Sequence, residues 1–527
     1  MSIYQKAFLG ILISIIGGGI YFNATLPTQT DDVWMFFRIF DNQPIFDGYN
    51  PSAGRFFPLA FLDLNILMQF SSSPKLFFFF NALEFVFMAL VVCVLSLKMW
   101  GNNFKITLAT LFVVFINIGF VTVITGICYP ERMQMLFLCI FILSLYFAQK
   151  PEANILWFIV CFVSASISIF YKETDFIFIG GFGALYLLFR FYETKSLKQT
   201  FDRNGYLALS RVVVALCFIF IYLIFIYPQM QGKVIEQAES FVLHIRDVIN
   251  VFLTHSFIFL LIPYILFLRI KDFYITKVLY PLYDSLLISA LVGGFSYFVL
   301  GRSSPYYFMP CYIIALLPIL FFAKMYFLRL KIVLMVVFAM HCFLNVPLAL
   351  SKYTQAKMLP PSYAKAMEFM ADYTHTTQEK PAIFLLGQNR DPDGLMLYGF
   401  VKDFLQYYGA KDFDLQTNKS NPDGFESIQS PFSIFGSSRV DIPKKGDLLY
   451  LDSFSKDYID EAYLNALNQN YQLVFESSYF GVYNITPKSI AKYLLQHSKA
   501  YAAYQNQPRV SANIFNAPLS VRIYQVR

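Results

Sequence analysis

Residues 30–64 read TDDVWMFFRIFDNQPIFDGYNPSAGRFFPLAFLDL and follow the first apolar segment of the chain. The stretch opens with two adjacent carboxylates, Asp31 and Asp32. It continues through aromatic residues and a turn rich in Pro and Gly to the cluster GRFFP at 54–58. Most of the sequence around it is apolar. A polar, charged loop between apolar segments predicts a structured element at a membrane surface, and chemistry is expected there first.

The composition predicts a membrane protein. Of the 527 residues, 57% are hydrophobic and 14% are charged, and the mean hydropathy is +0.52. A soluble domain carries about 25% charged residues. The net charge of +7 does not indicate nucleic acid, because the basic residues lie mainly in short loops between apolar runs, as the positive-inside rule requires.

Apolar runs of about 20 residues are long enough to cross a bilayer. Eleven spans are expected at 7–25, 76–97, 106–127, 133–149, 155–171, 175–190, 209–228, 252–269, 279–300, 306–323 and 331–350. The loops richest in Lys and Arg predict a cytoplasmic N-terminus. The first apolar run is expected to remain as an uncleaved helix, because no clear small-x-small site precedes Asp31 and many more spans follow. Everything after about residue 351 then lies on the outer face.

Two domains are therefore expected. Residues 1–350 form the transmembrane domain, and its first outer loop, 26–75, carries short interfacial helices at 32–40 and 56–70. Residues 351–527 form an extracytoplasmic α/β domain joined through the Pro-containing segment 358–362. Its pattern predicts strands at 382–386 and 448–451, helices at 393–408 and 456–468, and a strand pair at 471–485. All seven cysteines lie at or before residue 342, so this domain must fold without disulfides.

Ionisable residues recur in the loops of the expected outer face, where charge is costly unless it is paired or wet. They are Asp31, Asp32, Glu131, Arg132, Lys172, Glu173, Asp175 and Arg302. A carboxylate can take a proton from an attacking hydroxyl, and Arg or Lys can hold a phosphate leaving group.

Six of these residues, and Arg55 of the cluster at 54–58, also have a structural interpretation. Asp31 and Asp32 suit a helix N-terminus, and Arg55 suits a snorkelling side chain. Lys172 and Arg302 suit ordinary loop charges, and Glu131 and Arg132 suit an ion pair. The functional hypothesis depends on their convergence on one face.

Other chemistries have weak support. The five histidines are scattered, HExxH is absent, and there is no Walker loop or credible dinucleotide motif. No cofactor is required by the sequence. A divalent cation at Asp31 and Asp32 stays open, because hard cations take carboxylates.

Three motifs resemble the GT-C superfamily of membrane glycosyltransferases: TQTDDVW at 28–34, GRFFPL at 54–59 and GRSSPYYFMP at 301–310. The last is similar to a turn of protein mannosyltransferase and aminoarabinose transferase relatives. The absence of a WWD-type motif excludes the oligosaccharyltransferase branch. The resemblance implies a sugar donor on polyprenyl phosphate, inversion at the anomeric carbon, and Asp31 or Asp32 as base.

The same resemblance implies roles for further residues of the outer face. Arg55, Lys172, Arg302, Tyr306 and Tyr307 would bind the lipid phosphate, with Glu131, Arg132 and Glu173 in support. The expected function is a hexosyl- or pentosyltransferase of the bacterial inner membrane, acting on a glycan, lipid or protein acceptor of the envelope. An envelope polysaccharide polymerase or ligase and a lipid-linked sugar flippase are the alternatives.

Overall fold

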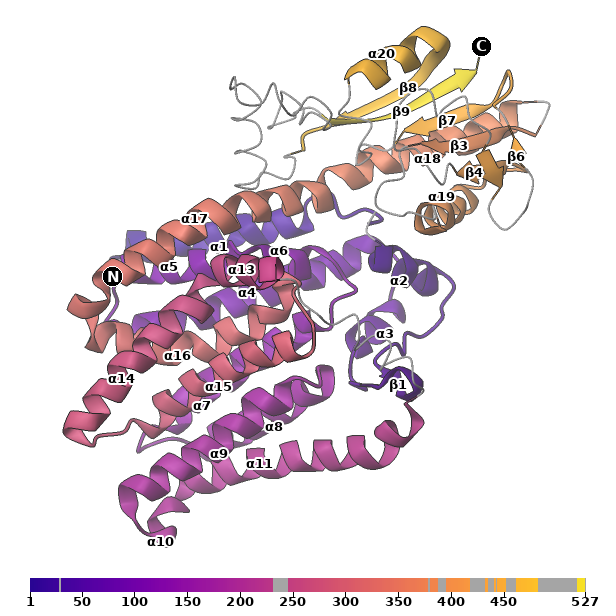
Figure 1. Ribbon diagram of the computed structural model, residues 1–527. Coiled ribbons are helices and arrows are strands. Elements are labelled where there is room, and N and C mark those ends of the chain that lie inside the picture. Colours follow the sequence, from indigo (N-terminus) through magenta and orange to yellow (C-terminus); the bar gives the residue numbers. More distant parts are fainter. Residues whose placement is uncertain are drawn as a thin grey trace. The chain divides into compact units, whose positions relative to one another are not determined.

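The computed structural model (Figure 1) describes residues 1–27, 30–230, 245–377, 380–386, 395–417, 432–434, 440–441, 443–451, 461–481 and 519–526. The chain divides into two compact units. The first comprises Met1–Phe22 and Asn42–Ala349, and the second comprises Asn23–Asp41 and Leu350–Arg527. Part of the first loop is thus grouped with the C-terminal residues.

The first unit is helical. Its main helices are α1 (Ile3–Tyr21), α3 (Leu62–Met68), α4 (Pro74–Met99), α5 (Phe104–Phe115), α6 (Ile118–Thr125), α7 (Glu131–Ala148), α8 (Ile155–Tyr171), α9 (Asp175–Thr194), α10 (Leu197–Thr200), α11 (Arg203–Ile221), α13 (Ile245–Thr254), α14 (Ile262–Thr276), α15 (Pro281–Val299) and α16 (Met309–Met325). Short π or 3₁₀ turns are η2 (Tyr222–Ile226), η3 (Tyr227–Gln229), η4 (Phe257–Leu261) and η5 (Pro305–Phe308). Helix α17 (Phe327–Lys357) belongs to both units.

The helices confirm a multi-pass membrane protein. Eight helices of the described residues are long and apolar enough to cross a membrane, or up to ten if each of two bent pairs is one span. The pairs bend by 66° between α5 and α6 and by 87° between the residues before and after 255–256. The remaining expected span, 155–171, coincides with α8, an apolar helix of 17 residues. The total of eleven stays a prediction.

The bend between α5 and α6 has its backbone groups satisfied by side chains. Asn117 accepts the N–H of Gly119 at 2.8 Å and so caps α6. Beyond the other end of α6, buried Asn81 donates to the carbonyls of Ile124 and Gly126 at 3.0 and 2.8 Å. Broken helices persist inside a bilayer only where such partners replace the missing backbone bonds.

The part of the first loop that lies in the first unit is folded on itself. Strands β1 (Tyr49–Asn50) and β2 (Arg55–Phe56) pair across the 3₁₀ turn η1 (Pro51–Ala53). Asn65 of α3 exchanges two hydrogen bonds with the backbone of Ile45, at 2.8 and 3.0 Å. The helix expected over 56–70 is the shorter α3, because residues 56–61 form the strand and turns that precede it.

The second unit is an α/β domain whose described residues form a mixed seven-stranded sheet of order β6-β5-β4-β3-β7-β9-β8. Its elements are α2 (Thr30–Phe40), α18 (Leu359–Thr376), β3 (Ala382–Leu386), α19 (Leu395–Tyr407), β4 (Asp414–Thr417), β5 (Phe432–Ile434), β6 (Val440–Asp441), β7 (Leu448–Leu451), α20 (Glu461–Asn470), β8 (Tyr471–Tyr479) and β9 (Leu519–Val526). Strand β3 is parallel to β4 and β7, and the other pairings are antiparallel.

The predicted strands 382–386 and 448–451 are confirmed as β3 and β7. Of the strand pair expected within 471–485, residues 471–479 form β8, which pairs with β9 about forty residues further along, while 482–485 lie outside the described residues. The Pro-containing segment 358–362 is no linker, since Pro360 lies in the first turn of α18, where a missing N–H costs nothing.

Candidate functional site

Asp31 and Asp32 belong to the second unit and lie in the first turn of α2. Negative charge is favourable there because it faces the positive end of the helix dipole. Asp31 is exposed, whereas Asp32 is fully buried. Successive helical residues point about 100° apart, so the two carboxylates have different surroundings.

Aromatic packing holds α2 within the second unit. The ring centroids of Phe37 and Phe404 lie 5.5 Å apart, and those of Phe40 and Tyr407 lie 4.9 Å apart. Helix α2 therefore packs on α19. This packing fixes the direction in which Asp31 and Asp32 point.

The Lys357 side chain is fully buried at the end of α17, and this burial lowers its pKa to about 7, while the carboxylate of Asp32 works to raise it. The side-chain amide of Asn23 donates to the carbonyl of Lys357 at 2.9 Å. A buried ammonium is stable only near an opposite charge. Asp32 thus offsets part of the cost of burying Lys357, while Asp31 is the exposed carboxylate of the pair.

Lys172 is the centre of a second cluster, in the first unit. It lies in the three-residue connection between α8 and α9, and its Nζ is 3.0 Å from Glu131 Oε1 at the start of α7. The ammonium also lies 4.8 Å from the ring centroid of Phe57 and 5.6 Å from that of Tyr307. Burial works to lower the pKa of Lys172, but the carboxylates of Glu131 and Glu173 outweigh it and raise the pKa above its ordinary value. The side chain is therefore a cation at neutral pH.

Arg302 brings a second cation to the same ring. Its guanidinium carbon is 6.0 Å from the Tyr307 ring centroid, and the side chain is exposed in the turn before η5. The Tyr306 and Tyr307 rings are 4.3 Å apart, and Tyr129 packs on Tyr306 at 5.0 Å. The structure thus brings Glu131, Lys172, Glu173, Tyr307 and Arg302 together, an arrangement that suits a phosphate bound by the two cations.

The turn that carries Lys172 is held by buried hydrogen bonds. Gln134 donates to Asp175 Oδ1 at 2.5 Å, and the hydroxyls of Thr174 and Tyr297 lie 2.9 Å apart. The sequence interpretation assigned no role to Gln134 or Tyr297. Their signal is weak, because a lone polar side chain within an apolar helix is also common in ordinary cores.

Arg132 is separate from the Lys172 cluster. Its Nη1 donates to both oxygens of Glu84 at 2.6 and 2.7 Å, and its Nη2 donates to Asp63. The expected ion pair between Glu131 and Arg132 is wrong, since neighbouring residues on a helix do not face each other. Arg132 instead ties α7 to α3 and α4. A partner for Asp63 and Glu84 could have been expected from the sequence, because acidic residues in apolar segments need one.

Arg55 is exposed in β2. Among the described residues, no ion pair or ring contact joins it to Lys172 or Arg302. The preceding Gly54 has a φ of +67°, and its carbonyl accepts the hydroxyl of Tyr222 at 3.0 Å. This contact fixes the backbone beside Arg55, whose phosphate-binding role stays a prediction.

A metal-binding group is not assembled by the described part of the chain: no three His, Cys, Asp or Glu side chains there are placed to hold one ion. Asp31 is exposed and Asp32 is buried, and a divalent cation at this pair stays a prediction.

Solved structures similar to this chain include an oligosaccharyltransferase of Archaeoglobus fulgidus tethered to an acceptor peptide, at 10% identity and a TM-score of 0.44, covering 99% of this chain and 88% of that one. ArnT from Cupriavidus metallidurans in the apo state is similar at 13% identity and a TM-score of 0.42, covering 89% of this chain and 96% of that one. ArnT bound to undecaprenyl phosphate is similar at 10% identity and a TM-score of 0.39, covering 88% and 96%.

No family model and no curated protein matches this sequence. The identities are 13% or lower and the TM-scores are below 0.5, so these likenesses carry no argument about this chain.

Proposed function

We propose that this protein is an integral membrane glycosyltransferase that moves a hexosyl or pentosyl group from a polyprenyl-phosphate carrier to an acceptor hydroxyl. The acceptor would be a glycan, lipid or protein of the bacterial envelope. The reaction would take place on the outer face of the inner membrane, with the N-terminus in the cytoplasm.

The observation that carries the proposal is the pair of cations beside Tyr307. Lys172 is charged, is only 12% exposed and contacts two aromatic rings in addition to Glu131. Arg302 lies on the same ring and is open to solvent. A cationic group at the end of apolar helices suits an amphipathic anion, because the helices accept a hydrocarbon chain and the cations accept its phosphate.

The chemistry assigned to the acidic pair is proton removal. Asp31 takes the proton of the acceptor hydroxyl as its oxygen forms a bond to the anomeric carbon. The bond between that carbon and the carrier phosphate oxygen breaks, and the electron pair stays on the phosphate. Lys172 and Arg302 stabilise the added negative charge. Asp32 positions the first turn of α2 through its interaction with Lys357.

The test is transfer of a labelled sugar from a polyprenyl-phosphate donor in liposomes. We expect Asp31→Asn to lower the rate about 10²- to 10⁴-fold, the usual contribution of a general base. Asp412→Asn, an exposed carboxylate of the second unit, is the matched control. Lys172→Gln should weaken donor use, and Lys172→Arg should restore part of it, because the charge is kept.

Three results would change the assignment. Full activity of Asp31→Asn would remove the base from this residue. Equal losses in Lys172→Arg and Lys172→Gln would indicate a structural rather than a phosphate-binding lysine. Movement of the lipid-linked sugar across the bilayer without transfer would favour a flippase.

A further inference from the structure

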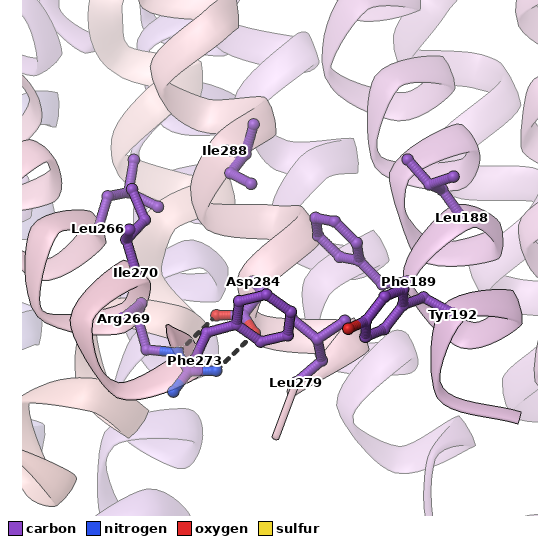
Figure 2. A pocket seen from close by; sticks show the side chains of 10 residues that line it. All are labelled: Leu188, Phe189, Tyr192, Leu266, Arg269, Ile270, Phe273, Leu279, Asp284 and Ile288. Carbon is purple, nitrogen blue, oxygen red and sulfur yellow. Dashed lines mark hydrogen bonds and ion pairs between the residues drawn. The ribbon is translucent and has the colours of Figure 1, made fainter. Parts of the chain in front are cut away.

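An apolar groove lies near the C-terminal end of α9, whereas Lys172 lies just before the N-terminal end of that helix. It has a volume of about 400 Å³, within the range of about 300–1,000 Å³ usual for small-ligand sites. It lies between the last turns of α9 and α14 and the first turns of α15. Figure 2 shows Leu188 and Tyr192 on one side, Leu266 and Ile270 on the other, and Ile288 between them. The surface offered to an occupant is almost wholly hydrocarbon.

The two ionised residues of the lining neutralise each other. Arg269 donates from Nε and Nη2 to the two oxygens of Asp284 at 2.8 and 2.9 Å, as the dashed lines in Figure 2 mark. Its Nη1 donates to the Tyr326 hydroxyl at 3.2 Å, and its Nη2 also donates to the Val278 carbonyl at 3.1 Å. With its donors engaged, Arg269 does not need a headgroup in the groove.

Two exposed lysines stand beside the aromatic residues of the groove wall. Lys195 Nζ lies 3.6 Å from the ring centroid of Tyr192, and Lys277 Nζ lies 5.7 Å from that of Phe273. The two rings are 5.6 Å apart and bridge α9 and α14. Both lysines cap the C-termini of these helices. Two positive charges thus stand beside a groove whose own ionised residues are paired with each other.

We propose that this groove binds an anionic phospholipid, with an acyl chain along the groove and the phosphate at Lys195 and Lys277. The occupant is argued from charge complementarity: the walls suit a hydrocarbon chain, and the two lysines beside them suit a net negative headgroup. Basic sites between membrane helices bind such headgroups elsewhere. The inference does not depend on the proposed transferase activity, because none of its residues belongs to that site.

The experiment is native mass spectrometry of the full chain titrated with phosphatidylglycerol or phosphatidylcholine of the same acyl composition. We expect phosphatidylglycerol to bind preferentially. The double variant Lys195→Gln/Lys277→Gln should weaken its binding about 30-fold, since each exposed lysine contributes to anionic-lipid affinity. The matched control is Lys105→Gln/Lys331→Gln, which removes the same charge from two other exposed lysines.

A second variant tests the groove itself. Ile270→Trp fills it from a lipid-accessible position and should lower phosphatidylglycerol binding while both lysines remain. Equal binding of the two lipids, or equal losses in the double variant and its control, would overturn the proposal. So would displacement of phosphatidylglycerol by an equimolar polyprenyl phosphate, which would make a carrier lipid the occupant.

Discussion

Removing the Arg132 guanidinium should destabilise the first unit strongly, because it leaves two carboxylates without their cation. The Arg132 side chain is 2% exposed, and those of Glu84 and Asp63 are 10% and 14% exposed. Breaking a buried ion pair by deleting one partner costs about 3–5 kcal/mol. We expect Arg132→Met, which keeps most of the volume, to fall in this range. Because both carboxylates keep some contact with solvent, losing the cation that they share should not cost twice the free energy of one broken pair.

The assay is unfolding in mixed micelles by SDS titration, followed by the fluorescence of the three tryptophans. Arg211→Met is the matched control. Arg211 is equally buried, but its hydrogen-bond partners are the Leu207 carbonyl and the Cys161 thiol. Its removal leaves no carboxylate unpaired, so the cost should stay below about 2 kcal/mol.

Neutralising the partners should reverse the loss. The triple variant Arg132→Met/Glu84→Gln/Asp63→Asn carries no buried charge at this place, and we expect it to recover most of the stability of the wild type. The reasoning is refuted if Arg132→Met costs less than about 1 kcal/mol. It is also refuted if the triple variant is no more stable than the single one.

Two further predictions concern other parts of the chain. Gly54→Ala should cost about 1–2 kcal/mol and speed limited proteolysis of the β1–β2 hairpin, because the φ of +67° disfavours a side chain and its Cβ would lie 3.1 Å from Met230 Cε; an unchanged cleavage rate would contradict this. In the second unit, burial works to raise the pKa of Glu476, but hydrogen bonds from Ser520 and Arg522 outweigh it and lower the pKa. The stability that the ionised Glu476 contributes should be complete above the ordinary carboxyl pKa of about 4.3. It should fade as the pH falls through the lowered pKa. Glu476→Gln should remove this dependence in unfolding curves taken between about pH 3 and 6.

The transmembrane helices were predictable because the signal for each is local. The apolar run that forms α4, for example, is recognised from its length and hydropathy alone. The bends were not predictable: the break before α6 depends on capping by Asn117, and the end of that helix is bound by Asn81, a residue of another span. An expected span at 106–127 therefore becomes two helices at 66° to each other.

The second unit shows the same limit for strands. Strands β3 and β7 are short runs of apolar residues and could be read directly. The partner of β8 could not, because β9 lies about forty residues away and nothing local in either strand specifies the other. Likewise, no local feature of 30–40 predicts that α2 packs on α19, since the aromatic rings that join them come from distant segments.

Adjacent ionisable residues explain why the candidate site was only partly readable. The sequence presents Glu131 beside Arg132 and Asp31 beside Asp32, and each pair invites a single role. On a helix the two members of such a pair point about 100° apart, so each meets a different environment. Glu131 meets Lys172, whereas Arg132 meets Glu84 and Asp63.

The same geometry separates Asp31, which is exposed, from Asp32, which is buried and interacts with Lys357. One member of each pair thus helps to hold the fold, and the other belongs to the proposed site. Substitutions of the two members of a pair should therefore have different effects. Loss of Arg132 or Asp32 should lower the stability of the protein, and loss of Asp31 should lower the rate of transfer in a protein that remains folded.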